Sequence, residues 1–114
     1  MNDKTSFNDM CLLINRNNPQ LTPRQEAFRI WLENKGLASS TIWNYLSGVG
    51  ECSHYLSLKI GLEFDFYEES DYARARKAAD VLVNDGGFQE FLALSRMFYW
   101  KTGLNHYLEF LRYR

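Results

Sequence analysis

The sequence predicts an all-α fold, a compact bundle of four to five helices. The chain has 114 residues, which is enough for one domain with one core. It contains only two Pro and seven Gly, so long stretches are free of helix breakers. Eight Phe, seven Tyr and three Trp make up 16% of the chain, which favours helices that pack through aromatic side chains.

Two parts are expected, an N-terminal tail with a short helix over residues 1–21 and a helical domain over residues 22–114. Ser6 can cap the short helix, which should end before Pro19. Its apolar residues follow the helical period: Phe7, Met10, Cys11 and Ile14.

The first helix of the domain is predicted over residues 23–35. Thr22 followed by Pro23 is an N-cap with proline at the first helical position, and Glu26 lies one place past the position that a capping box uses. Gly36 is suited to end the helix in a left-handed conformation.

A longer helix is predicted over residues 40–58, with the Ser40 hydroxyl as its cap. Gly48 and Gly50 lie inside it, and each weakens a helix by roughly 1 kcal/mol relative to Ala. We therefore expect the backbone of a neighbouring helix to approach closely at these glycines.

Residues 64–67 are expected to form an extended connector that inserts aromatic side chains into the core. Further helices are predicted over residues 70–84, 88–96 and 99–112. The predicted core consists of Phe28, Trp31, Ile42, Tyr45, Leu46, Val49, Leu82, Phe91, Leu104, Leu108 and Leu111.

The net charge of −1 provides no overall field that would attract a polyanion, so any nucleic-acid surface must be a local patch. Residues 61–71 are acidic and residues 88–114 are the basic end of the chain. No secretory signal and no membrane-spanning stretch is visible, and we expect a cytoplasmic protein.

Residues that could carry chemistry are few, and we expect no enzymatic activity, no cofactor and no metal site. His54 and His106 lack the partners of a zinc site and are interpreted as structural or solvent-exposed. Cys11 and Cys52 are interpreted as buried small hydrophobic residues. Glu33-Asn34-Lys35 has an acid-x-Lys spacing, but it falls at a helix end without an adjacent acidic ligand.

One group of residues is suited to binding phosphate. A helix N-terminus carries partial positive charge and free N–H groups. The N-terminus of the predicted 40–58 helix is surrounded by short polar or basic side chains: Lys35, Ser39, Ser40, Thr41 and Asn44. The alternative interpretation is an ordinary cap followed by a polar helix face.

Two stretches carry a resemblance to known domains. The first is Phe28-x-x-Trp31-Leu32-x-x-x-Gly36-Leu37-x-Ser39-x-Thr41-Ile42-x-x-Tyr45-Leu46, followed by His54-Tyr55-Leu56. It resembles the helical core-binding (SAM-like) domain on the N-terminal side of tyrosine recombinases. The second resembles the last helix of related small domains beside the nuclease domains of bacterial restriction proteins, and it is Leu104-x-x-Tyr107-Leu108-x-Phe110-Leu111.

The resemblance implies a module that clamps duplex DNA through the start of the helix that opens at the Ser/Thr motif. Ser39, Thr41 and Tyr45 match that motif directly, and Ser40 and Asn44 are their neighbours. The residues of recombinase chemistry belong to a separate domain, so the resemblance implies binding without catalysis.

We therefore expect a non-catalytic module that contacts duplex DNA mainly through phosphates, with Arg96 and Lys101 as a second anchor. It would be part of, or related to, a recombination or restriction system, or a small phage or mobile-element factor. A linked nuclease or recombinase domain, or a partner protein, is a further expected partner. The alternative is a protein-interaction or self-association module that uses an exposed aromatic patch of Trp43, Phe98, Tyr99 and Trp100.

Overall fold

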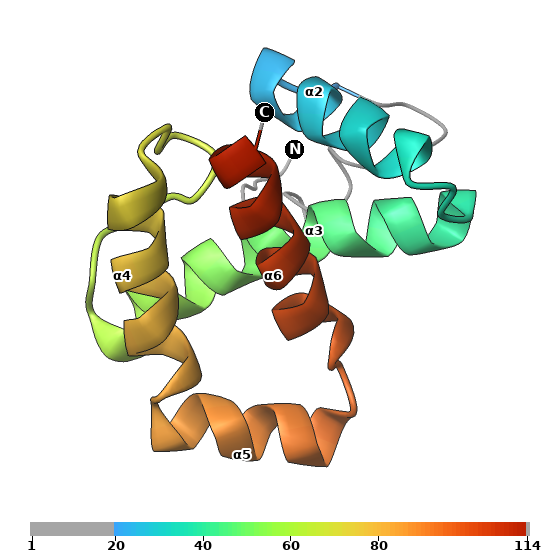
Figure 1. Cartoon of the computed structure of the whole chain (residues 1–114). Helices are drawn as coiled ribbons and strands as arrows, with labels where there is room; N and C mark the ends of the chain where they lie inside the picture. The colour runs from blue at the N-terminus through green and yellow to red at the C-terminus, as the bar shows by residue number, and fades with distance from the viewer. Residues whose placement is uncertain (1–19, 114) are drawn as a thin grey trace, which may run out of the picture.

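The computed structural model describes residues 20–113, and the regular elements of this part of the chain are all helices, with no strand. The predicted all-α fold is therefore confirmed for the described residues, whereas the short helix expected before Pro19 lies outside them. The elements in chain order are α2 (Pro23–Asn34), α3 (Ser39–Tyr55), the π-helical turn η1 (Leu56–Ile60), α4 (Tyr72–Val83), α5 (Gly86–Ser95) and α6 (Tyr99–Tyr113) (Figure 1).

Side-chain caps set the beginnings of three helices. Thr22 accepts a hydrogen bond from the backbone of Gln25, whose side chain accepts one from the backbone of Thr22, so the capping box uses Gln25. Asp71 caps α4 and Asp85 caps α5. Because Asp85 is the cap, α5 begins at Gly86, two residues earlier than predicted.

The long helix predicted over residues 40–58 is α-helical from Ser39 to Tyr55 and π-helical from Leu56 to Ile60. Its last turn is the π-helical η1, which ends at Gly61 in the left-handed conformation with φ 87°. The amides of Gly61 and Leu62 both donate to the carbonyl oxygen of Leu56. Glycine is suited to this position because it lacks the Cβ that makes positive φ costly.

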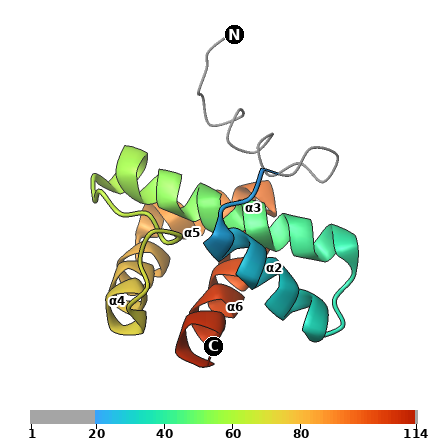
Figure 2. The same ribbon diagram turned by 90° about the horizontal axis from the view of Figure 1, so that it is seen from above.

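The interface of α3 with α6 is the most extensive in the structure. An ideal Cβ at Gly48 would lie 3.1 Å from Cα of Trp100, and one at Gly103 would lie 3.0 Å from both Cα and the carbonyl oxygen of Tyr45. The close approach expected at Gly48 is confirmed, and Gly103 is its counterpart on α6. Figure 2 shows α3 running across α6, with α4 and α2 on either side of α6.

Most of the predicted core is buried, but Trp31, Tyr45 and Phe91 are only half-buried and pack at its edge. Cys52 is buried as predicted, which raises the pKa of its thiol, and its Sγ lies 3.6 Å from the carbonyl oxygen of Trp100. The largest fully buried side chains include Phe28, Tyr107, Phe66 and Phe88.

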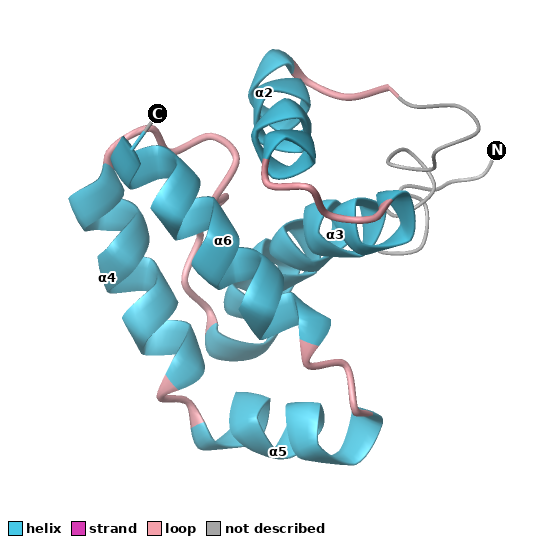
Figure 3. Ribbon diagram, turned by 45° about the vertical axis from the view of Figure 1, so that its right-hand side comes forward, coloured by secondary structure: helices cyan, strands magenta, loops and turns pink. Residues whose placement is uncertain are grey.

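The connector between η1 and α4 inserts aromatic side chains into the core, as predicted. Phe66 is 0% exposed and Tyr67 is 8% exposed. The Phe66 amide donates to Ser53 Oγ at 3.0 Å, its carbonyl accepts from Tyr107 Oη at 2.8 Å, and Tyr67 Oη donates to the carbonyl of Leu46 at 2.7 Å. The segment makes a turn at this point instead of staying extended, and Figure 3 shows it as a loop that passes beside α6.

The glycine contact between α3 and α6 predicts a large effect of a small substitution. Gly103→Ala should lower the free energy of unfolding by about 1–3 kcal/mol, because the added methyl group meets backbone that cannot turn away. This cost should exceed the roughly 1 kcal/mol that Ala gains over Gly in a helix. Urea denaturation measures the difference.

Gly86→Ala is the matched control, since an added Cβ there meets no atom within 4 Å. It should leave stability unchanged or raise it by up to about 1 kcal/mol. Equal stability of the two variants would contradict the assigned role of Gly103.

Candidate nucleic-acid interface

The turn from α2 to α3 positions the start of α3. Lys35 is the C-cap of α2, and Gly36 follows it in the left-handed conformation with φ 82°, as the sequence predicts. Ala38 then returns the chain to an extended conformation, with φ −67° and ψ 151°, and α3 begins at Ser39. The predicted cap at Ser40 is wrong, because Ala38 occupies the N-cap position and Ser40 is already helical.

The start of α3 has no side-chain cap, unlike the starts of α2, α4 and α5. The first helical hydrogen bond runs from the amide of Ile42 to the carbonyl of Ala38 at 3.0 Å. The N–H groups of Ser39, Ser40 and Thr41 precede it and have no acceptor within the helix. No acidic residue lies in the first turn, so the partial positive charge there is not offset by a neighbouring carboxylate on the helix.

The polar side chains around this N-terminus face solvent to different degrees. Ser39, Ser40 and Asn44 are exposed, and Thr41 is half-buried. The predicted group of short polar side chains is therefore gathered at one helix end and is open to solvent, with Lys35 only a short turn away.

Lys35 is already engaged by two groups. Its Nζ lies 3.6 Å from Glu109 Oε1 on α6 and 4.5 Å from the centre of the Trp31 ring. Both side chains of the ion pair are partly exposed, so the pair is weak and can exchange for another anion.

Tyr45 does not present its ring freely to solvent. The ring stacks on His106 of α6 with centroids 5.0 Å apart and an angle of 22° between the planes. His106 in turn meets the edge of Trp31 at 6.4 Å. Through these ring contacts Trp31 of α2, Tyr45 of α3 and His106 of α6 pack against one another close to the start of α3.

His106 is structural, in agreement with one of the two interpretations from sequence. Its Nδ1 is buried and makes no hydrogen bond to the described residues. Burial is the main reason that its pKa lies below the usual 6.5; Glu109 raises the pKa and Lys35 lowers it further. The spacing of residues in the sequence reveals neither the stacking of His106 nor the contact of Glu109 with Lys35. Both arise because α6 meets α2 and α3 only in the folded chain.

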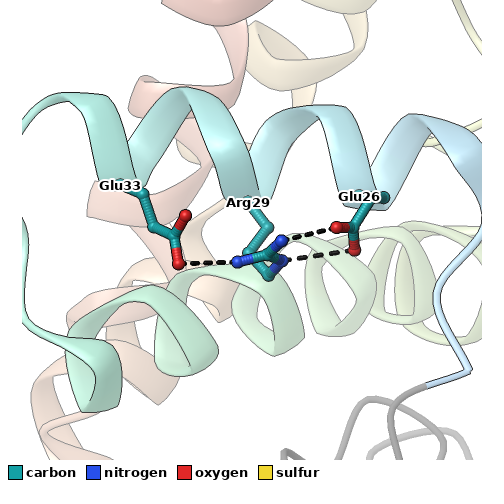
Figure 4. A network of polar contacts seen from close by, with 3 residues as sticks. All are labelled: Glu26, Arg29 and Glu33. Atoms are coloured by element: carbon teal, nitrogen blue, oxygen red, sulfur yellow. Dashed lines mark hydrogen bonds and ion pairs between the residues drawn. The ribbon is translucent and has the colours of Figure 1, made fainter.

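A separate network on α2 occupies the carboxylate of the acid-x-Lys tripeptide. Arg29 lies between Glu26 and Glu33, with Nη1 of Arg29 2.6 Å from Glu33 Oε2 (Figure 4). The hydrogen bond from Arg29 lowers the pKa of Glu26. Arg29 is held by two carboxylates, and Arg24 donates to the carbonyl of Glu69 and to Tyr107 Oη. Lys35, the C-cap of α2, is therefore the remaining cation of this segment for the start of α3.

Arg96 and Lys101 are exposed but lie apart from this group. Arg96 is the C-cap of α5 in the left-handed conformation, with φ 63°, and Lys101 is in the first turn of α6. Within residues 20–113, no hydrogen bond or ion pair joins either residue to Lys35 or to the start of α3. Lys101 and Glu109, the partner of Lys35, are roughly 12 Å apart along the α6 axis.

The predicted aromatic patch is wrong in most of its members. Trp100 is only 4% exposed: its ring packs against Phe91, and its backbone lies against Gly48 of α3. Trp43 and Tyr99 are half-buried. Phe98 alone of the four is exposed, at 51%.

Among residues 20–113, no group of three or more His, Cys, Asp or Glu side chains could hold a metal ion. No described helix combines the length and the apolar character that crossing a bilayer requires. Comparison with protein-family models, with characterised proteins and with solved structures finds no match.

The partial burial of His106, which disfavours its charged form, makes stability depend on pH. Its pKa is lower in the folded chain than the 6.5 of an unfolded one, so the unfolded state binds the proton first as the pH falls. The free energy of unfolding should therefore be constant above about pH 7.5 and decrease as the pH falls below 6.5.

Denaturation of the native protein and of His106→Phe over this pH range tests the assignment. Phe keeps an aromatic ring against Tyr45 but cannot be protonated, so the decrease between pH 6.5 and 5 should become smaller. An identical pH profile for both proteins would show that His106 is not responsible.

Proposed function

We propose that this chain binds duplex DNA without catalysis, mainly by holding backbone phosphates at the start of α3. The observation that carries the proposal is the uncapped N-terminus of α3, surrounded by the exposed side chains of Ser39, Ser40 and Asn44 and adjacent to Lys35. A helix N-terminus with free N–H groups is a favourable site for a phosphate group.

The hydroxyl groups and backbone amides would supply hydrogen bonds, and Lys35 would supply the charge. A phosphate oxygen at the first turn of α3 can accept from the free amides of Ser39 and Ser40. Lys35 would exchange its contact with Glu109 for the phosphate. Thr41, half-buried, would orient the first turn, and Tyr45 would act as a positioning residue through its stacking on His106.

Lys101 is the proposed second anchor, with Arg96 beyond it. The roughly 12 Å along α6 that separates Lys101 from Glu109 is comparable to the width of the major groove of DNA, about 12 Å. Lys101 and Lys35, which lies beside Glu109, could therefore contact phosphates on the two sides of one groove. Phosphate contacts of this kind supply affinity without sequence readout, so binding should be weakly selective and salt-dependent.

The resemblance to core-binding domains suggests in which kind of system this DNA binding takes place. It favours a role beside a nuclease or recombinase domain, in a restriction or recombination system or in a phage or mobile element. The module would hold the duplex, and a separate domain would carry out any chemistry.

Neutralising Lys35 is the first test of the phosphate contact. Lys35→Gln should weaken binding to duplexes of unrelated sequence by a similar factor, because a phosphate contact carries no base information. The slope of log affinity against log salt should decrease by roughly 1, since about one fewer counterion is released. Fluorescence anisotropy at several salt concentrations measures both quantities.

Lys77→Gln, at an exposed position on α4, is the control with the same change of charge. It should leave affinity and slope nearly unchanged. Equal effects of the two substitutions would mean that only net charge matters, and no binding of the native protein at low salt would overturn the proposed function.

Removing Glu109 should have the opposite effect. This carboxylate competes with phosphate for Lys35 and repels the DNA backbone, so Glu109→Gln should tighten duplex binding by about twofold to fivefold, the scale of a surface ion pair. Glu63→Gln, at an exposed position after η1 and away from both proposed anchors, is the matched control and should change affinity less. Unchanged affinity of Glu109→Gln would show that Lys35 does not leave Glu109 when DNA binds.

A further inference from the structure

An apolar surface lies at the end of α5 and on the link to α6. Three side chains form it: Leu94, 78% exposed, Met97, 37% exposed, and Phe98, 51% exposed. We call these three residues the α5 tip. On its inner side α5 buries Phe88 and Leu92 in the core, so the α5 tip is what remains on the outside. Grouped exposed apolar residues of this kind mark sites of interaction with another molecule.

The edge of the α5 tip is positively charged. Arg96 and Lys101 are exposed and form no ion pair with the other described residues. Glu90, one helical turn before Leu94, is the single acidic residue of this neighbourhood. Two α5 tips facing each other would bring these cations together, so a symmetric contact of the α5 tip with itself is disfavoured.

A second exposed apolar surface has the opposite charge. Leu58 in η1 is 71% exposed, and Leu62 just after it is 38% exposed. They are followed by exposed acidic residues. Lys59 lies beside them in the chain, and Arg74 of α4 pairs with the neighbouring Glu69 at 3.9 Å. We call this surface the acidic connector, and it consists of Leu58, Leu62, Glu63, Asp65 and Glu68.

The two surfaces are complementary in apolar character and in charge. Leu94 and Leu58 are the two most exposed large apolar side chains of the described residues. Figure 1 shows the end of α5 at the lower right and the connector after η1 at the left of the molecule, so one chain cannot bring its own two surfaces together.

We infer that the α5 tip docks on the acidic connector of a second copy of this chain. Leu94 and Phe98 would pack against Leu58 and Leu62, while Arg96 and Lys101 would face Glu63, Asp65 and Glu68. Because the two surfaces differ and lie apart, each copy can use one surface to bind the preceding copy and the other to bind the next. The association is therefore head-to-tail, and it goes beyond the proposed DNA binding.

Sedimentation equilibrium without DNA tests this inference independently of the proposed function. The native protein should associate progressively with concentration, and salt should weaken the association. Leu94→Ser and Leu58→Ser should each raise the dissociation constant at least about tenfold, the scale of a central interface residue. Both side chains are exposed, so the folded chain should tolerate either change.

Mixing the two variants gives the decisive result. Leu94→Ser keeps an intact acidic connector and Leu58→Ser keeps an intact α5 tip, so the mixture should form a 1:1 dimer and stop there. Val81→Ser, at an exposed apolar position of α4 outside both surfaces, should associate like the native protein.

Three results would overturn the inference. One is a native protein that remains monomeric at every concentration, which would leave the α5 tip for a different partner. Another is a Leu58→Ser variant that associates like the native protein, as a symmetric contact through the α5 tip requires. The third is a mixture of the two variants that forms no dimer.

Discussion

The contact of α3 with α6 through Gly48 and Gly103 is the constraint on which the rest of the structure depends. The missing side chains let the backbones meet, with Cα of Trp100 beside Gly48 and Cα of Tyr45 beside Gly103. At this separation Trp100 is buried and the apolar faces of both helices form one core. The connector is fastened to the same pair of helices, since Phe66 and Tyr67 bond to Ser53, Leu46 and Tyr107.

The same contact determines the environment of the candidate DNA interface. Once Gly103 lies against Tyr45, the next turns of α6 bring His106 under the Tyr45 ring and Glu109 to Lys35. The first turn of α3 extends past this contact, and Ser39 and Ser40 in it remain exposed. The stacked rings of Tyr45 and His106 pack close to the uncapped helix end. This arrangement suits the binding of a phosphate group, because a helix end held by packing loses little conformational freedom on binding.

Local signals in the sequence predicted much of the fold. Thr22 and Gly36 act at helix ends through interactions with near neighbours, which spacing reveals. Ala38 as the start of α3 and the burial of Trp100 were missed, because they depend on the turn after Gly36 and on the approach of α6. The polar residues at the start of α3 were predicted from sequence, but the engagement of Lys35 by Glu109 arises from tertiary contact alone.

Arg96 and Lys101 have two proposed uses, as a second DNA anchor and as the charged edge of the α5 tip. Both uses draw on two cations that form no ion pair with the other described residues, so DNA and a second copy of the chain would compete for them. A second copy of the chain would not compete with DNA for the start of α3, because the proposed contact between copies does not include it. Phosphate binding at the start of α3 can therefore be tested by itself.

An NMR titration of ¹⁵N-labelled protein with a short duplex tests this phosphate binding most directly, because it observes the proposed donor groups themselves. If phosphates bind at the start of α3, the amide signals of Ser39, Ser40 and Thr41 should shift most, with smaller changes at Lys101. Shifts confined to Leu94–Phe98, or no shifts at low salt, would contradict it.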